Sequence, residues 1–274
     1  MSVSLIYRNE QDPPRPPQPR PVLLTGAGGR VGRWVAKALA ARSDLALRLM
    51  IENESQRERV GGCGEIVMGD IRDALSIRPA FEGIDTVVHL AANPSTRAAW
   101  TDLQGPNISG LYNVLEAAVD AGCRKVVLAS SVNAVTGSAL QDRPIDEEQP
   151  IAPGNLYGAT KALAEAVGRV FAQDQGLSVL CVRLGGVISP DTAASDRLAP
   201  GMKRVAISYD DVCQFFTRCV DDETVRFGVF HAMSEADGPL MSIDRARAVL
   251  GFHPRHKLTP EGFIDVSNPG GEAD

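Results

Sequence analysis

A tyrosine, a lysine and a pair of serines in this sequence could together move a proton at a substrate hydroxyl. Tyr157 and Lys161 are four residues apart in the segment 156–173, which is predicted to form a long helix, so their side chains share one face. Ser130 and Ser131 end a predicted strand. A lysine charge favours the phenolate, and a serine hydroxyl can orient the substrate oxygen. The same tyrosine–lysine spacing also occurs on ordinary helix surfaces, so it needs support from other motifs.

A glycine-rich turn lies between a short apolar strand at 22–24 and a predicted helix at 30–41. Glycine at such a turn lets the backbone bend tightly and approach a pyrophosphate, which the helix N-terminus then attracts. A purely structural glycine turn is the alternative. The residues expected to bind a dinucleotide here are Gly26, Gly28, Gly29, Arg30, Val31 and Gly32.

Two acidic positions follow the next two predicted strands. Glu52 lies 20 residues beyond Gly32, near the end of the strand 45–51. A carboxylate there accepts hydrogen bonds from the adenosine ribose and repels a 2′-phosphate, which favours NAD without excluding NADP. It could instead be a solvated charge in a polar run. Asp70 and Ile71 could hold the adenine ring, or Asp70 could cap a helix.

Composition and charge restrict the class of protein. Hydrophobic residues make up 44% of the sequence and charged residues 23%, as is typical of a globular protein. The formal net charge of −6 argues against nucleic acid or an anionic membrane as the main partner. Five cysteines without a CxxC pair predict reduced thiols. The sequence contains no apolar run of 18 residues, so no membrane-spanning helix is expected. We therefore expect a cytoplasmic protein that acts on a small molecule.

Strands and helices alternate along the chain, which predicts an α/β fold with a Rossmann-type, doubly wound parallel sheet. We expect a disordered, proline-rich tail at 1–21, with a proline-rich docking segment as the alternative, and a dinucleotide-binding domain at 22–185. A small C-terminal substrate-binding region would cover 186–274, with 207–232 returning to the sheet. The expected strands are 22–24, 45–51, 65–68, 86–90, 125–129, 178–182 and 227–231, and the expected helices are 30–41, 107–121, 156–173 and 242–250.

Taken in chain order, these motifs resemble the extended short-chain dehydrogenase/reductases, also called the NAD-dependent epimerase/dehydratase family. The resemblance implies hydride transfer between a nicotinamide and a substrate carbon, with Tyr157 as acid/base. It also implies that Lys161 contacts the nicotinamide ribose and that Ser131 polarises the reacting oxygen. Leu90, Ala91 and Ala92 would contact the cofactor. The matching stretches are TGAGGRVG (25–32), GDI (69–71), HLAA (89–92), Asn107, ASS (129–131), YGATK (157–161) and VRLGGV (182–187).

Within that group the chain is most similar to the uronate dehydrogenase-like branch of NAD-dependent sugar dehydrogenases. The supporting stretches are PVLLTGAGGRVG, NLYGATKALAE, ISYDDVCQFF and SIDRARAVLGFHP. Ile51 stands where that branch has a ribose-binding Asp, which moves this role to Glu52 or Asn53. Further departures from the branch pattern, all on the substrate side, are Pro94, Val132-Asn133 and Gly186.

Several further positions are candidates with an alternative beside each. The resemblance implies that Asn107 binds a water in a locally opened helix, whereas its residue type equally suits an N-cap. Arg204 could bind a substrate carboxylate or phosphate, as could Arg183, Arg197 and Lys203, or each could be solvated surface charge. The substrate is expected to contact Asn93, Ser131, Asn133, Gly186 and Arg204. The histidines lack ligand spacing, so no metal site is predicted.

Three functions remain open at this level. The leading hypothesis is an NAD-dependent oxidoreductase acting on a small sugar, sugar acid or related hydroxyl substrate. An NAD-dependent sugar epimerase or dehydratase that retains its cofactor is the alternative, and a dinucleotide sensor is a third. The resemblance also implies a homodimer formed through the helices at 107–121 and 156–173.

Overall fold

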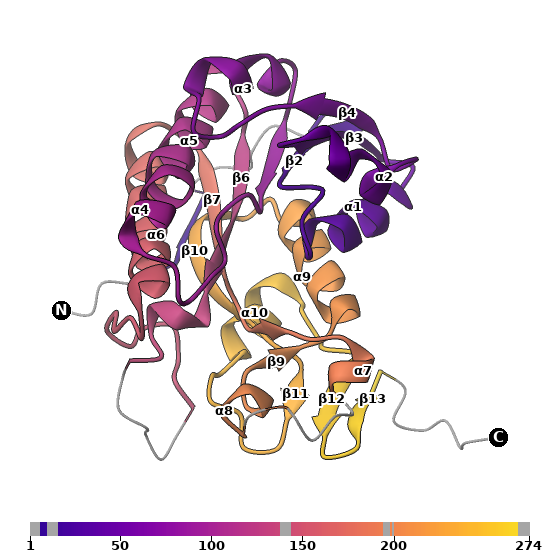
Figure 1. The fold of residues 1–274 in the computed structure, drawn as a ribbon, viewed down its shortest axis with the longest axis vertical. Coiled ribbons are helices and arrows are strands. Elements are labelled where there is room, and N and C mark those ends of the chain that lie inside the picture. Colours follow the sequence, from indigo (N-terminus) through magenta and orange to yellow (C-terminus); the bar gives the residue numbers. More distant parts are fainter. Residues whose placement is uncertain (1–5, 10–15, 138–143, 194–197, 199, 268–274) are drawn as a thin grey trace.

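The computed structural model describes residues 6–9, 16–137, 144–193, 198 and 200–267. Within them an eight-stranded sheet runs through the centre of the molecule (Figure 1). All of its strands pair in parallel except the first, which is antiparallel. Its order is β1 (Ile6–Arg8), β10 (Val225–Ala232), β7 (Ser178–Leu184), β6 (Lys125–Ser131), β5 (Thr86–His89), β2 (Arg20–Thr25), β3 (Leu45–Ile51) and β4 (Glu65–Met68).

The strand order reverses direction between β2 and β5. Chain connections leave these neighbouring strands toward opposite sides, which opens a crevice at their carboxyl ends where parallel sheets bind ligands. The architecture is the predicted doubly wound α/β fold.

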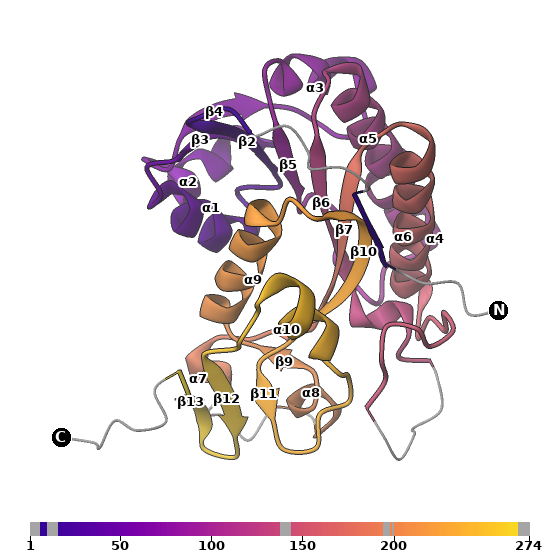
Figure 2. The ribbon, with the colours of Figure 1, turned by 180° about the vertical axis from the view of Figure 1, so that it is seen from behind.

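Helices cover both faces of the sheet (Figures 1 and 2). Successive side chains of a strand point to opposite faces, so Val22 and Leu24 pack into one core and Leu23 into the other. The first core includes α1 (Gly32–Ala40), α9 (Tyr209–Asp221) and α10 (Asp244–Leu250). The second includes α3 (Ala74–Phe81), α5 (Gly110–Asp120) and α6 (Leu156–Asp174).

The smaller elements of the C-terminal part gather beyond the carboxyl end of the sheet (Figure 1). They form a three-stranded sheet and a separate strand pair, whereas α9 and β10 belong to the main layers. No helix among the described residues is long and apolar enough to span a bilayer. The remaining elements are α2 (Arg57–Val60), α4 (Trp100–Leu103), α7 (Pro190–Ala193), α8 (Pro200–Lys203), β8 (Gly186–Val187), β9 (Ala206–Ile207), β11 (Glu235–Ala236), β12 (His256–Thr259) and β13 (Gly262–Asp265), with short η1 (Glu54–Gln56), η2 (Gln104–Ser109) and η3 (Val132–Ala134).

The prediction of a disordered tail over 1–21 is wrong at two places. Ile6–Arg8 form β1, an edge strand that pairs with β10, and β2 begins at Arg20. Ile6 packs against one core and Tyr7 against the other, so the apolar contacts stabilise an otherwise polar segment. This pairing joins residues more than 200 positions apart, which no local pattern reveals. Residues 1–5 and 10–15 of the predicted tail lie outside the described residues.

Candidate active site

The glycine turn after β2 packs its backbone directly against the backbone that follows β5. Gly26 has φ +68°, and a Cβ there would lie 2.6 Å from the backbone nitrogen of Ala91. A Cβ on Gly32 would collide with the carbonyl oxygen of Gly26. No side chain caps α1, which starts at this turn and runs for nine residues. The turn therefore offers the bare backbone and free helix N-terminus that a pyrophosphate requires, and the chain fits a dinucleotide.

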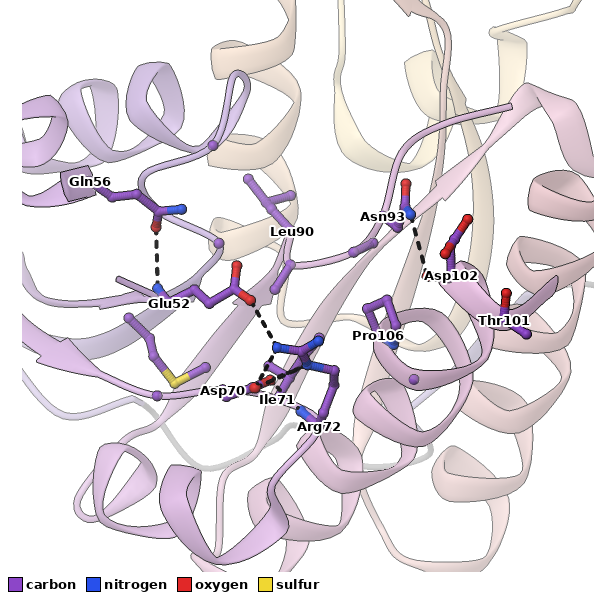
Figure 3. A pocket seen from close by; sticks show the side chains of 17 residues that line it. Glu52, Gln56, Asp70, Ile71, Arg72, Leu90, Asn93, Thr101, Asp102 and Pro106 are labelled. Atoms are coloured by element: carbon purple, nitrogen blue, oxygen red, sulfur yellow. Dashed lines mark hydrogen bonds and ion pairs between the residues drawn. The ribbon is translucent and has the colours of Figure 1, made fainter. Parts of the chain in front are cut away.

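A cavity of about 550 Å³ extends from the glycine turn past the ends of β3 and β4 (Figure 3). We call it the adenosine cavity. Several residues predicted to bind the cofactor line it, namely Gly26, Gly29, Glu52, Asp70, Ile71, Leu90, Ala91 and Ala92. Asn93, expected to contact the substrate, lies at this cavity with Asp102 and Thr101 instead of at the next one. Asp70 does not cap α3; Asp73 does, accepting from Leu75 and Ser76.

A second cavity, of about 710 Å³, adjoins the same turn, and we call it the reaction cavity. It joins the glycine turn to the groups that could perform chemistry, because Ser131, Tyr157 and Lys161 all line it. Arg204 does not line it; its Nε donates to the Gly238 carbonyl at 2.8 Å. Other lining residues include Arg30, Val31, Gly32, Pro94, Ser95, Thr96, Asn133, Thr136, Gly186, Val187 and Met202.

The N-terminus of α6 is built to place Tyr157. Asn155 caps the helix by accepting from the Gly158 backbone N–H at 2.8 Å, and its amide donates to Asn133 Oδ1 at 2.9 Å. A Cβ at Gly158 would clash with the Asn133 carbonyl, so glycine allows η3 and α6 to touch. These contacts fasten the turn after β6, which follows Ser131, to the helix that carries Tyr157.

Lys161 lies beneath that tyrosine, one helical turn further along. Its Nζ donates to the Ala129 carbonyl at 2.8 Å and lies 5.6 Å from the centroid of the Tyr157 ring. Burial lowers the pKa of Lys161 to about 8. Burial raises the pKa of Tyr157, while the hydrogen bond with Ser131 and the charge of Arg30 act in the opposite direction. The arrangement can exchange a proton with a hydroxyl in the cavity.

Asn107 lies inside a continuous helical run and not at its start. The run consists of α4, the π-helical turn η2 and α5, so the N-cap interpretation of Asn107 is wrong. Pro106 lacks a backbone N–H, which explains why the regular helix opens here. The Asn107 side-chain amide binds the backbone of Asn93 on both sides: its Oδ1 accepts from the Asn93 N–H at 2.8 Å, and its Nδ2 donates to the Asn93 carbonyl at 3.1 Å. Nδ2 also donates to Thr160 Oγ1 at 3.1 Å.

Behind the reaction cavity lies a buried polar network that the sequence did not reveal. Arg183 is fully buried and forms two 2.8 Å bonds to Glu165, which also accepts from Ser130 at 2.5 Å. The idea that Arg183 binds a substrate anion is therefore wrong, because its fork is already satisfied by Glu165. The spacing of Glu165, four residues after Lys161, was the available signal for its inward position. Arg197 lies outside the described residues.

The remaining polar candidates include the histidines. No group of three or more His, Cys, Asp or Glu side chains comes together among the described residues. His89 is buried beside Thr25, with 2.8 Å between Nδ1 and Oγ1, and burial lowers its pKa to about 3. Its imidazole is therefore neutral at pH 7.

Comparison with known proteins decides the family. The model of the NAD dependent epimerase/dehydratase family matches residues 22–211. The chain belongs to this family. Family membership confirms the predicted resemblance and identifies the protein as an NAD-dependent enzyme.

The chain aligns over most of its length with members of this family of similar sequence or structure. The NAD-dependent glucose-6-phosphate dehydrogenase of Haloferax volcanii is 33% identical, across 86% of this chain and 93% of that protein. The L-arabinose 1-dehydrogenase (NAD(P)(+)) of the same organism is 32% identical, across 85% and 96%. A uronate dehydrogenase from Agrobacterium tumefaciens, solved as a mutant complexed with NAD, has a TM-score of 0.75 at 25% identity, across 87% of this chain and 86% of that one.

Proposed function

We propose that this protein is a dehydrogenase that oxidises a hydroxyl of a small sugar or sugar acid with NAD. One observation carries the proposal: Ser131, Tyr157 and Lys161 line the same cavity as the glycine turn. A dinucleotide with its pyrophosphate on that turn would have the adenosine cavity on one side and these three side chains on the other. The similar proteins named above are dehydrogenases of glucose 6-phosphate, L-arabinose and uronates, which supports a sugar-derived substrate.

The roles of the three side chains follow from their positions. Bound NAD supplies the hydride acceptor. Tyr157 as phenolate takes the proton of the substrate hydroxyl while the hydride leaves the same carbon, so that a carbonyl forms. The positive charge of Lys161 beneath the ring favours the phenolate. Ser131 holds the reacting oxygen, and Asn107 is a positioning residue that fixes the loop after β5.

The substrate side of the reaction cavity suits a ligand with several hydroxyls. Ser95, Thr96, Asn133 and Thr136 offer donors and acceptors there. Gly186 leaves room filled by Met202, whose sulfur occupies the place a Cβ would take. Of the predicted substrate contacts we keep Ser131, Asn133 and Gly186, and replace Arg204 and Asn93 with Thr136 and Ser95.

The test is reduction of NAD, followed by absorbance, in the presence of a panel of aldoses, uronates and sugar phosphates. We expect turnover with at least one of them and its near-complete loss in Tyr157→Phe. Tyr209→Phe is the matched control, because Tyr209 stacks on Trp34 outside the reaction cavity. Product formed without net NADH, from a protein that retains its cofactor, would instead identify the epimerase or dehydratase alternative.

We also propose that the protein forms a homodimer through α5 and α6, which lie side by side on one face of the sheet (Figure 1). Tyr112, Leu156, Leu163 and Val170 are large apolar side chains exposed on these two helices. Exposed apolar side chains on neighbouring helices are favoured at a protein interface. Light scattering should give a dimer mass for the wild type and a monomer mass for Leu163→Glu, with Leu75→Glu on α3 as the control. A monomeric wild type would contradict this.

A cytoplasmic location is proposed on the basis of thiol chemistry. All five cysteines are free in the structure, including the buried Cys123, Cys181 and Cys219. Burial raises the pKa of Cys123 to about 12, which keeps this thiol protonated and unreactive. Fractionation of the source cells should recover the enzyme in the fraction that contains cytoplasmic markers; recovery with envelope or secreted material would contradict the proposal.

A further inference from the structure

Arg72 is the only cation among the described residues that line the adenosine cavity. It lies between the carboxylates of Glu52 and Asp70, at the ends of β3 and β4 (Figure 3). The distance from Arg72 Nη2 is 2.7 Å to Asp70 and 3.2 Å to Glu52. One arginine therefore balances part of the negative charge at the end of the cavity where the ribose of a bound adenosine lies.

The position of Arg72 is fixed by its neighbours. Asp70 accepts from the Arg72 backbone N–H at 2.9 Å and from Nε at 2.9 Å, in addition to the bond from Nη2. The aliphatic part of Arg72 lies against Gly105 of η2, where a Cβ would come within 3.3 Å of Cδ. Among the described residues Nη1 has no hydrogen-bond partner. The guanidinium is thus held in place with donors to spare.

Glu52 is held at its backbone and free at its carboxylate. The Glu52 N–H donates to Gln56 Oε1 at 3.2 Å, whereas the side chain is 58% exposed and bonds to Arg72 alone among the described residues. Ile51, the preceding residue, is apolar and fully buried, so it presents no fixed carboxylate to the ribose. The Glu52 carboxylate, which would repel a 2′-phosphate, is therefore free to rotate out of the cavity.

We propose that Glu52 and Arg72 form a subsite for the adenosine 2′ position that accepts either a hydroxyl or a phosphate, so that the enzyme uses NADP as well as NAD. With NAD, the 2′-hydroxyl donates to Glu52 while Arg72 orients that carboxylate. With NADP, the 2′-phosphate replaces Glu52 as the partner of Arg72, which binds it through paired N–H groups. The inference rests on the proposed function only in placing the adenosine in this cavity.

The charges also set the order of preference. Glu52, Asp70 and Arg72 sum to one negative charge, which disfavours a phosphate and leaves NAD the better cofactor. Glu52→Gln makes the set neutral and should move the preference toward NADP. Arg72→Gln makes it doubly negative and should remove binding of the 2′-phosphate.

Binding of adenosine 2′,5′-bisphosphate and of 5′-AMP, measured by calorimetry on the full chain, tests this without nicotinamide or sugar. We expect the wild type to bind both. Arg72→Gln should weaken the bisphosphate by about tenfold or more relative to 5′-AMP, and Glu52→Gln should strengthen it by about tenfold. Arg57→Gln is the matched control, because Arg57 pairs with Glu54 and does not line the cavity. It should change neither affinity.

The ratio of the two affinities within one variant removes general effects on folding. Arg72→Lys, which keeps the charge but loses the planar fork, should fall between the wild type and Arg72→Gln. A wild type that binds 5′-AMP but not the bisphosphate, or an unchanged ratio in Arg72→Gln and Arg72→Lys, would overturn the inference. A sugar panel without turnover, combined with the expected ratios, would overturn the proposed dehydrogenase activity and leave this subsite standing.

Discussion

Glu165 and Arg183 form a fully buried, doubly hydrogen-bonded ion pair, with both N–O distances at 2.8 Å. Glu165 comes from α6, four residues after Lys161, and Arg183 comes from β7. The pair therefore fastens the helix that bears the proposed acid/base group to the centre of the sheet. Ser130 joins the pair through Glu165, while the adjacent Ser131 points to the reaction cavity. Two neighbouring serines thus lie in different surroundings, one in the buried network and one at the reaction cavity.

Breaking this pair should destabilise the protein strongly. Glu165→Gln leaves a buried guanidinium without its countercharge, and we expect it to lower the free energy of unfolding by about 3–5 kcal/mol. The double variant Glu165→Met/Arg183→Met should cost less than Glu165→Gln, because neither charge remains. Urea unfolding measures both. Glu54→Gln, which breaks an exposed pair with Arg57, is the control and should leave stability nearly unchanged. Equal losses for Glu165→Gln and Glu54→Gln would refute the argument.

Stability should fall as the pH is lowered from 7 to 5. Burial lowers the pKa of His89 to about 3 in the folded chain, whereas the unfolded value is about 6.5. Between these values the unfolded state binds more protons, so acid favours unfolding. The loss at pH 5 is about 2 kcal/mol for this group. His231 adds to it with the same sign, and Glu147, whose pKa burial raises, acts in the opposite direction.

His89→Gln isolates that contribution, since an amide can still bond to Thr25 without titrating. Urea unfolding at pH 7 and pH 5 should show a smaller difference in this variant than in the wild type. The exposed His253→Gln should retain the wild-type difference. If His89→Gln shows the full wild-type difference, the burial of His89 is not its cause.

The glycine turn should tolerate no side chain at Gly26. Gly26→Ala adds a Cβ 2.6 Å from the Ala91 backbone and forces alanine to φ +68°, so we expect both NAD affinity and stability to fall. Gly62→Ala is the control, because Gly62 also has a positive φ, +77°, but nothing within 4 Å. It should cost about 1–2 kcal/mol of stability and leave NAD binding intact. Equal NAD affinities in the two variants would contradict the role of the glycine turn in binding the pyrophosphate.

The charge of Arg30 should tune the pH profile of the reaction. Arg30 lines the reaction cavity and lowers the pKa of Tyr157 by favouring the phenolate. Arg30→Gln should therefore raise that pKa and move the alkaline rise of kcat/KM for sugar oxidation to higher pH. Arg33→Gln, three residues along and stacked over Trp34, should leave the profile unchanged. A profile shifted to lower pH in Arg30→Gln would exclude this electrostatic role.

Much of the fold followed from local sequence because its signals are local. The strands at 45–51 and 65–68 lie where apolar runs predict them, and α6 begins at Leu156 as predicted, after its Asn155 cap. The helix predicted at 107–121 was misplaced in its first turn. The helical segment begins at Trp100 and widens into a π-helical turn around Pro106. That turn follows from the missing backbone N–H of proline, which the spacing of apolar residues does not reflect.

The family, the seven parallel strands of the main sheet in chain order and the residue types at the site could all be predicted from the sequence, since each rests on a pattern within a short stretch. What each polar side chain contacts depends instead on how the elements pack in three dimensions. Arg183 lies near the end of β7 and Arg72 comes shortly after β4, yet Arg183 is buried against Glu165 whereas Arg72 lines the adenosine cavity. Arg72 pairs with the nearby Asp70 and stays about half exposed, whereas Arg183 meets Glu165 of α6 in the closed interior. That difference in burial depends on how elements far apart in the sequence pack together.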